Sequence, residues 1–464
     1  MELVNTMKPS MISYKEGNVT VVAVEGDIPA WLHGRLISNG PGQFQVGDTR
    51  FNHWFDGFAL LKSFSFKKGH VAVEARYLKS LQYTKSNNRD DLFLSEFGTT
   101  NRGLLGVIRN LIHGSKYDNT NINIAETAER KLFAMTETPN VVVFNKTSLE
   151  TTAIEQYAKD YSPQISTAHP IRDYKRNTLV NVGIKFGYKT QYMILETDLA
   201  SGKCQCIARY FSKIPFYHHS FAMTENYVIL YQTPVVISRR KALSPWRPIS
   251  DAMAIKPELG SKIIVINRHN GESTVFTSDS FYCFHSSNAY EKNHEIVLDL
   301  VTTHRGDYGL FSLDDMDKEK EFQSKFTRFT INMKKKDLRV NSLYSGRIEF
   351  PRVNERDSLG NDYTYSYMCN KRKGSSVFDQ ILKLNVKTGA VKTWCLDGVA
   401  VGEPVFIQCE NKKHDSILMV LLYDTVNNRS GLAIISSESL KTIATVWLSC
   451  LFPPGLHGQF FQDD

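Results

Sequence analysis

Long hydrophobic runs are missing from this sequence of 464 residues. The longest, ILMVLLY at residues 417–423, has the length of a strand and falls far short of the roughly 18 residues that span a bilayer. The first residues, MELVNTMKPSM, lack the basic start and continuous apolar core of a secretory signal. We therefore expect no membrane-spanning segment and a cytoplasmic protein.

Cysteine is scarce, and charge of one sign is nowhere concentrated. Seven scattered cysteines are more typical of free thiols than of a disulfide framework. Cys204 and Cys206 form a CxC pair without a second pair, which favours alternate positions of a strand over a zinc site. The net charge of +8 is dispersed, and no nucleic-acid motif is present. We therefore expect no nucleic-acid partner, and attraction to an anionic membrane surface is the better interpretation of the charge.

Short β-like runs separated by turn signals fill most of the chain. Residues 16–80 read as meandering antiparallel strands, and NRHNGES and KTGA carry hairpin chemistry. No series of βαβ units is visible, and no shift in composition marks a boundary. The sequence predicts an all-β protein, with residues 1–464 as a single domain and residues 1–15 as an N-terminal extension.

Histidine and glutamate recur along these runs at intervals of about 50 to 65 residues, which is close to the repeat length of β-propeller blades with added loops. The recurring residues are His169, His219, His285, Glu349, Glu403 and His457. The inner strands of a propeller meet at one axis, so we expect these side chains to converge there. The final segment, LFPPGLHGQFFQDD, would close the ring and bring His457 to the axis.

Imidazoles that converge on an axis predict a metal site. A metal-bound histidine usually donates its other N–H to a carboxylate. Glu137, Glu349 and Glu403 lie in otherwise apolar runs, where an unpaired carboxylate would be costly to bury, and we expect them to orient the histidines. An all-imidazole site differs from the iron site of two histidines and one carboxylate, and it leaves open positions for dioxygen.

Residues 100–117 interrupt the β pattern with an amphipathic helix. Its apolar residues are Leu104, Leu105, Ile108, Leu111 and Ile112, and its basic residues are Arg102, Arg109, His113 and Lys116. Such a helix either packs on the propeller or lies on a membrane. We expect membrane contact, with a second contact at SRRKALSPWRP, where Leu243 and Trp246 stand among basic residues.

The motifs NHWFDG, TAHP, HHSFAMTENY, FHSSNAYE, EFPRVN, GEPVF and GLHG follow one another in this order. With them the chain resembles the carotenoid cleavage oxygenases, from about GDIPAWLHGRLISNGPG to the C-terminus. The resemblance implies a seven-bladed β-propeller with a helical or loop cap over its top face, and one Fe(2+) per chain. It implies that the iron ligands are His169, His219, His285 and His457, backed by Glu137, Glu349 and Glu403. The same resemblance implies that His218 is not a ligand and that Thr136 matches a threonine whose methyl group crowds one open iron position.

The implied activity is dioxygen-dependent cleavage of one conjugated C=C bond of a carotenoid or apocarotenoid, giving aldehyde or ketone products such as retinal. The alternatives are a stilbene-cleaving dioxygenase, a retinyl ester isomerohydrolase and a non-catalytic propeller scaffold. The lack of a lysine in the MTETPN run weakens the hypothesis of a stilbene-cleaving enzyme. The intact ligand set weakens the hypothesis of a non-catalytic scaffold. Aromatic residues beside the ligands either line a substrate tunnel or pack in the core, namely Phe216, Tyr217, Phe221, Phe281 and Phe284.

Two features depart from the animal members of the family. The chain is shorter, so loops that influence substrate choice there are missing here. The segment after EFGT lacks the Pro-Asp-Pro-Cys element and contains no cysteine, so lipid attachment at that point is unsupported.

Overall fold

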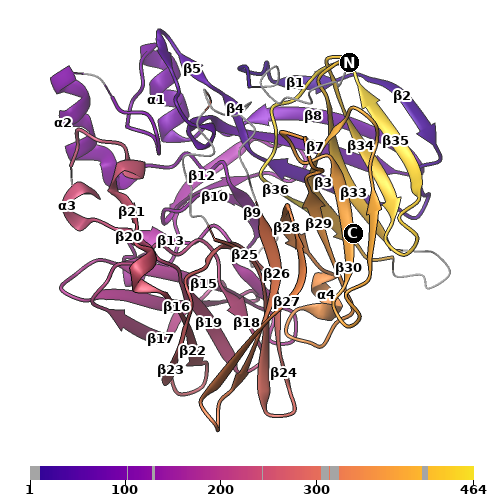
Figure 1. Cartoon of the computed structure of the whole chain (residues 1–464). Helices are drawn as coiled ribbons and strands as arrows, with labels where there is room; N and C mark the ends of the chain where they lie inside the picture. Colours follow the sequence, from indigo (N-terminus) through magenta and orange to yellow (C-terminus); the bar gives the residue numbers. More distant parts are fainter. Residues whose placement is uncertain are drawn as a thin grey trace.

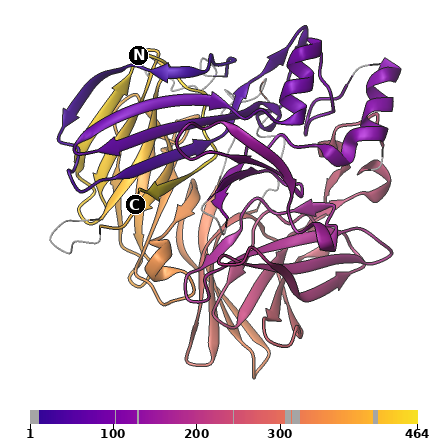
Figure 2. The same ribbon diagram turned by 180° about the vertical axis from the view of Figure 1, so that it is seen from behind.

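The computed structural model describes residues 11–101, 103–127, 131–242, 244–304, 313, 323–409 and 416–463. Seven antiparallel sheets of four to six strands radiate around one axis (Figure 1; Figure 2 shows the opposite side). The prediction of an all-β, seven-bladed propeller is confirmed. Arg102 and Leu243 lie outside the described residues.

Blades 2, 3 and 4 follow one another along the chain, each as a meander. Blade 2 comprises β9 (Asn123–Glu126), β10 (Leu132–Met135), β11 (Asn140–Phe144) and β12 (Thr151–Gln156). Blade 3 comprises β13 (Ile165–Ser166), β14 (Ile171–Asp173), β15 (Thr178–Lys185), β16 (Thr190–Asp198) and β17 (Cys204–Ser212). Blade 4 comprises β18 (Ala222–Met223), β19 (Tyr227–Gln232), β22 (Ser261–Asn267) and β23 (Ser273–Ser278). Cys204 and Cys206 occupy alternate positions of β17, as expected, and all seven cysteines are free.

Blades 5 and 6 repeat the pattern with longer strands. Blade 5 comprises β24 (Tyr282–Lys292), β25 (Glu295–Thr303), β26 (Ser324–Asn332) and β27 (Asp337–Gly346). Blade 6 comprises β28 (Ile348–Arg352), β29 (Tyr365–Asn370), β30 (Gln380–Asn385) and β31 (Val391–Trp394). The short helix α4 (Glu355–Ser358) connects β28 to β29.

The ring is closed twice, because each end of the chain supplies a strand to a blade built mostly from the other end. Blade 1 comprises β1 (Gly17–Val19), β8 (His70–Tyr77), β7 (Phe58–Lys67), β3 (Gly34–Asn39) and the C-terminal β36 (His457–Gln462), with β4 (Pro41–Gln43) paired to β7. Blade 7 comprises β32 (Ala400–Ile407), β33 (Ile417–Asp424), β34 (Arg429–Ser436), β35 (Thr442–Leu448) and the N-terminal β2 (Val21–Gly26). The prediction that the last segment closes the ring is confirmed. The prediction of one meander over residues 16–80 is wrong at its start, since β2 pairs with β35 rather than with its neighbours in sequence.

The chain before β36 is held by both blades that it joins. The Lys62 ammonium on β7 donates to the Pro453 carbonyl at 2.7 Å, and the Leu456 N–H donates to the Asn39 carbonyl at 2.9 Å. The Tyr423 hydroxyl on β33 accepts the Gly455 N–H at 2.8 Å. These bonds explain why a histidine so near the C-terminus can keep a fixed position.

Neighbouring blades pack face to face, and an apolar cluster fills each of the seven interfaces. Strands buried on both faces read as continuous apolar runs rather than alternating ones. All eight residues of β33 are buried for this reason, which accounts for the run at residues 417–423. This packing makes the blades a rigid frame for the inner strands.

Helices and short strands gather over one end of the propeller, at the upper left of Figure 1. They include α1 (Leu81–Arg89), α2 (Gly103–His113), α3 (Arg239–Ala242), β5 (Gln45–Val46), β6 (Thr49–Arg50), β20 (Val235–Ile237) and β21 (Met253–Ile255). This is the predicted cap. In the described part of the chain, no helix has the length and apolar character needed to cross a membrane.

Candidate metal centre

The four histidines singled out by the sequence converge on the propeller axis. His169 lies between β13 and β14, His219 precedes β18, His285 lies within β24 and His457 is the first residue of β36. The centroid of the His169 ring is 4.5 Å from that of His219, 4.6 Å from that of His457 and 4.9 Å from that of His285. Residues from four blades therefore form one cluster.

The donor atoms of this cluster fit a metal ion. One ring nitrogen from each of His169, His285 and His457 lies within 4.8 Å of the other two. Nε2 of His169 is 3.0 Å from Nε2 of His219, and the buried Nε2 of His285 has no hydrogen-bond partner among the described residues. Burial, and after it the neighbouring imidazoles, lower the pKa of His169 well below its ordinary value. The ring is thus neutral, as a metal ligand must be.

In three of these rings, Nδ1 lies within hydrogen-bond distance of a glutamate carboxylate. His219 Nδ1 is 2.6 Å from Glu137 Oε1, and His285 Nδ1 is 2.7 Å from Glu349 Oε2. His457 Nδ1 is 3.0 Å from Glu403 Oε1. A carboxylate at Nδ1 keeps the proton there and leaves the Nε2 lone pair facing the axis. In the described part of the chain, His169 has no such carboxylate partner.

Glu403 is kept ionised by its surroundings. Burial acts to raise the pKa of Glu403, but the positive charge of Arg352, and after it the contact with His457, bring it down to about 2. The Arg352 guanidinium lies 3.7 Å from Glu403 Oε1 and donates to the Gly458 carbonyl at 3.1 Å. Arg352 therefore fixes both the carboxylate and the strand that carries His457.

Replacing Glu403 with Gln should weaken metal binding. The amide keeps the shape of the carboxylate and can still accept the imidazole N–H, but it loses the charge that makes the His457 ring more basic. A loss of about 10 to 100-fold in metal affinity is typical of such partners. Competition with a chelator measures this loss. Glu355→Gln is the control, because Glu355 contacts Arg352 at 3.3 Å but pairs with no histidine among the residues that the structure describes. Wild-type affinity in Glu403→Gln would contradict this role.

The inner strands lose regular pairing where the site residues lie. The register of β24 shifts between Cys283 and Ser286, next to His285, and that of β28 shifts after Glu349. Phe350 has a φ of 56°, which is unusual for a bulky residue and marks local strain. Irregular pairing beside active sites redirects side chains, and here it turns them toward the axis.

Two further residues contact the glutamates of the site, a role that the sequence analysis did not give them. The Tyr217 hydroxyl donates to Glu137 Oε1 at 2.6 Å and lies 2.9 Å from His219 Nδ1. Arg352 stands in the motif EFPRVN, three residues after Glu349, so its proximity to the site could have been read from the motif. Glu137 was expected in a strand, but it lies in the turn between β10 and β11.

A cavity of about 1150 Å³ leads from the cap to the histidines. Thr136 and Glu137 line it beside His219, and its other wall residues include Trp54, Phe55, Phe97, Tyr217, Phe284, Phe350 and Phe378. Of the aromatics left open by the sequence, Tyr217 and Phe284 line the cavity. Phe216, Phe221 and Phe281 are buried in the blade interfaces instead.

His218 differs from its neighbour His219 in its surroundings. Its ring is buried against Tyr192, Phe216 and Tyr231, with centroid distances of 5.7 to 6.3 Å. Burial lowers the pKa of His218 to about 3, so the ring is neutral. That His218 is not a ligand stays a prediction.

Comparisons with known proteins give consistent results. The sequence model of the RPE65 family (retinal pigment epithelial membrane protein) matches residues 12–462. The chain is 28% identical to the β,β-carotene 15,15'-dioxygenase of Gallus gallus, and the alignment covers 95% of each chain. It is 26% identical to the mitochondrial carotenoid-cleaving dioxygenase of Mustela putorius furo, where the alignment covers 95% of this chain and 94% of that one. The structure is similar to that of the cobalt-substituted apocarotenoid oxygenase of Synechocystis, with a TM-score of 0.87 at 24% identity, covering 100% of this chain and 99% of that one.

The family match extends over nearly the whole chain, and the fold is that of the Synechocystis enzyme. The histidines and glutamates on the axis come from the motifs that first suggested the resemblance. The chain belongs to the RPE65 family, the family of the carotenoid cleavage oxygenases.

Proposed function

We propose that this protein is an iron(II)-dependent dioxygenase that cleaves one conjugated C=C bond of a carotenoid or apocarotenoid. The observation that carries the proposal is the axial cluster of four imidazoles, three of them backed by glutamates, at the end of a large aromatic cavity. Family membership and the dioxygenase names of the relatives support it. A non-catalytic scaffold gives no reason to bury three carboxylates against histidines at the end of a cavity.

Each group at the site has a task in this reaction. His169, His219, His285 and His457 would hold one Fe(2+), which when bound supplies the chemistry that activates dioxygen. The three glutamates keep a proton on Nδ1 of their partner rings. Thr136, beside Glu137 in the cavity wall, would limit with its methyl group the space in which dioxygen can approach the bound metal.

The cavity suits a long, apolar polyene. Its aromatic side chains provide flat apolar surfaces that would fix the chain and exclude water near the histidines. Glu96 also lines the cavity, but burial, and then the charge of Asp56, raise the pKa of its carboxyl to about 8. At neutral pH this group is therefore mostly uncharged, and the wall there remains compatible with a hydrocarbon.

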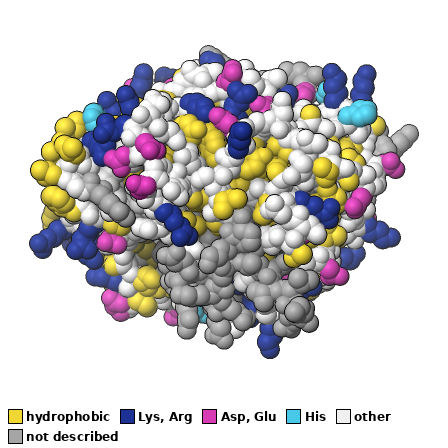
Figure 3. Space-filling model, turned by 90° about the horizontal axis from the view of Figure 1, so that it is seen from above, with side chains coloured by type: hydrophobic (Ala, Val, Ile, Leu, Met, Phe, Trp, Pro, Cys, Tyr) yellow, Lys and Arg dark blue, Asp and Glu magenta, His cyan; other side chains and the backbone are white. Residues whose placement is uncertain are grey.

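We also propose that the protein docks on a membrane at the mouth of this cavity. The five apolar side chains predicted to contact lipid are all exposed, from 40% for Ile108 to 73% for Leu105. Figure 3 shows hydrophobic side chains among Lys and Arg at the left edge of the molecule, the side on which α2 lies in Figure 1. The alternative that this face packs on the propeller does not agree with that exposure. An exposed apolar face with basic neighbours is the form that binds at lipid interfaces.

A second exposed segment adjoins α2. Asn110 on α2 donates to the Pro245 carbonyl at 3.1 Å, which places Trp246, 61% exposed, beside the helix. Lys241 and Arg247 are exposed at the cavity mouth. We predicted from the sequence that the basic residues of this helix, Arg109 among them, meet anionic headgroups. For Arg109 this is not supported, because its side chain is largely buried and pairs with Asp91 at 3.0 Å. Lys116 and the second segment supply the accessible positive charge.

A panel of substrates tests the proposed activity. Purified, iron-loaded protein is incubated with carotenoids, apocarotenoids, a hydroxystilbene and a retinyl ester, and the products are identified by mass spectrometry. The proposal expects pairs of carbonyl fragments from a carotenoid or apocarotenoid. Cleavage of only the stilbene, isomerised retinol from the ester, or no product from iron-loaded protein would contradict it.

A further inference from the structure

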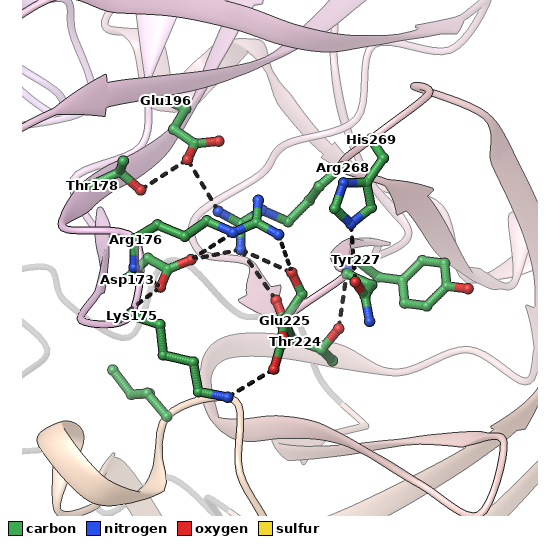
Figure 4. Close-up of polar contacts among 12 residues, drawn as sticks. Asp173, Lys175, Arg176, Thr178, Glu196, Thr224, Glu225, Tyr227, Arg268 and His269 are labelled. Carbon is green, nitrogen blue, oxygen red and sulfur yellow. Dashed lines mark hydrogen bonds and ion pairs between the residues drawn. The ribbon is translucent and has the colours of Figure 1, made fainter.

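A buried arginine joins blades 3 and 4 away from the cavity. Arg268, the residue after β22, has a side chain that is 0% exposed. Its guanidinium lies 2.8 Å from Asp173 Oδ2 and 3.3 Å from Glu196 Oε1, and it also donates to the carbonyls of Thr224 and Glu225 at 3.3 Å each (Figure 4). A buried charge needs such compensation from several sides.

Two of these contacts lead directly to metal-site histidines. Asp173 ends β14 and follows His169 by four residues, while Thr224 lies in the turn after β18 and follows His219 by five residues. Glu196, by contrast, lies on β16, which carries no histidine. The same guanidinium therefore joins the segment that carries His169 to the segment that carries His219.

The two turns that follow these segments are also bound to each other. Asp173 Oδ1 accepts the backbone N–H groups of Lys175 and Arg176 at 3.1 Å, so this carboxylate shapes its own turn. Lys175 pairs with the Glu225 carboxylate at 2.7 Å, and Arg176 donates to the Glu225 carbonyl at 3.0 Å. Figure 4 shows Arg268 between the two turns. These contacts tie the turn after β14 in blade 3 to the turn after β18 in blade 4.

His169 is the histidine that depends most on this junction. The other three rings are each held by a glutamate, but His169 has no carboxylate partner in the described part of the chain. Its position is set by the backbone on either side of it. Before His169, the Asn123 side chain donates a hydrogen bond to the Ala168 carbonyl at 2.9 Å. After His169, the pair of Asp173 and Arg268 fixes the chain.

We propose that Arg268 is a positioning residue for the metal centre, which sets the separation of His169 and His219 through Asp173 and the backbone at Thr224 and Glu225. The inference rests on the proposed metal centre. It separates the two carboxylates on Arg268. Asp173 transmits position to His169 through its own segment, whereas Glu196 neutralises charge and accepts a hydrogen bond from Thr178 on β15 at 2.9 Å. Both carboxylates are buried to a similar degree. The variants that replace each of them by its isosteric amide, Asp173→Asn and Glu196→Gln, can therefore be compared directly.

The test compares Asp173→Asn with Glu196→Gln in the full-length, metal-free protein. Co²⁺ is the probe, its affinity is measured by competition with a chelator, and its visible absorption spectrum reports ligand geometry. Asp173→Asn should weaken Co²⁺ binding by about tenfold, the lower end of the range for groups that orient metal ligands, and should alter the spectrum. Glu196→Gln should keep affinity and spectrum near wild type, even if both variants lower the unfolding temperature of the metal-free protein.

A second pair covers the case in which Asp173→Asn does not fold. Arg268→Lys keeps the charge but cannot span both turns, and we expect the same tenfold loss. Its control is Lys383→Arg. Lys383 is a buried cation that also joins two blades, through the carbonyls of Ser437 and Glu438 at 2.8 Å, but it lies on β30, away from the axis.

Several results would overturn the proposal. Wild-type Co²⁺ affinity and spectrum in folded Asp173→Asn or Arg268→Lys would do so, as would equal losses in Asp173→Asn and Glu196→Gln. Failure of the wild-type protein to bind Co²⁺ would instead refute the metal centre itself, and the positioning role with it.

Discussion

The His285→Ala, His457→Ala double variant is expected to contain almost no iron and to lose its activity, whereas the wild-type protein is expected to bind about one iron per chain. Four imidazoles are the whole proposed ligand set, so the double variant keeps only two of the four ligands. Glu349 and Glu403 would also lose their imidazole partners. Metal analysis of purified protein measures the loss, and circular dichroism verifies that the fold remains.

The matched control for this variant is His218→Phe. His218 is buried beside the site, but its ring packs against aromatic side chains, so this variant should keep its iron. Stoichiometric iron in the double variant would show that the ligand assignment is wrong. Loss of iron in His218→Phe alone, with a native fold, would place the ligand at the neighbouring residue.

The Leu104→Glu, Leu111→Glu double variant should remain folded and iron-loaded but should no longer float with anionic liposomes. Both side chains are 66% exposed, so a carboxylate there is solvated in the free protein. At a lipid surface it would face the acyl boundary and the negative headgroups. Each basic residue near such a surface contributes about 1 kcal/mol of attraction, and the new charges would oppose it. Wild-type protein should release from the liposomes at high salt because salt screens that attraction.

Val340→Glu with Val391→Glu is the control for this pair. These residues are 47% and 44% exposed on β27 and β31, and the change in net charge is the same. We expect this control to bind liposomes as the wild type does. Undiminished flotation of the Leu104, Leu111 variant would remove α2 from the membrane contact, and unfolding would mean that its apolar face supports the fold.

The fold was largely predictable because a propeller repeats. Each blade contributes an inner strand, so a regular interval of chemically unusual residues was enough to identify the axis. The split of residues 16–26 into β1 and β2 was not predictable in the same way. Both strands have the same local β pattern, and only the tertiary pairing of β2 with β35 places them in different blades.

The residues at the site were easier to predict than their partners. Histidine and buried glutamate are recognisable from residue type and an apolar setting, since their burial requires compensation. Arg268 has no such signal, because it follows an ordinary strand and its role depends on two turns distant in sequence. The aromatic residues were ambiguous for a similar reason. Phe216 and Tyr217 are adjacent, yet one packs between blades and the other contacts Glu137.

Oxygen labelling tests the central claim most directly. Iron-loaded wild-type protein is given its best carotenoid or apocarotenoid substrate under ¹⁸O₂, and the carbonyl products are reduced at once to alcohols so that their oxygen cannot exchange with water. A dioxygenase predicts that each of the two fragments carries one ¹⁸O atom. Label in only one fragment, or in neither, would contradict the account.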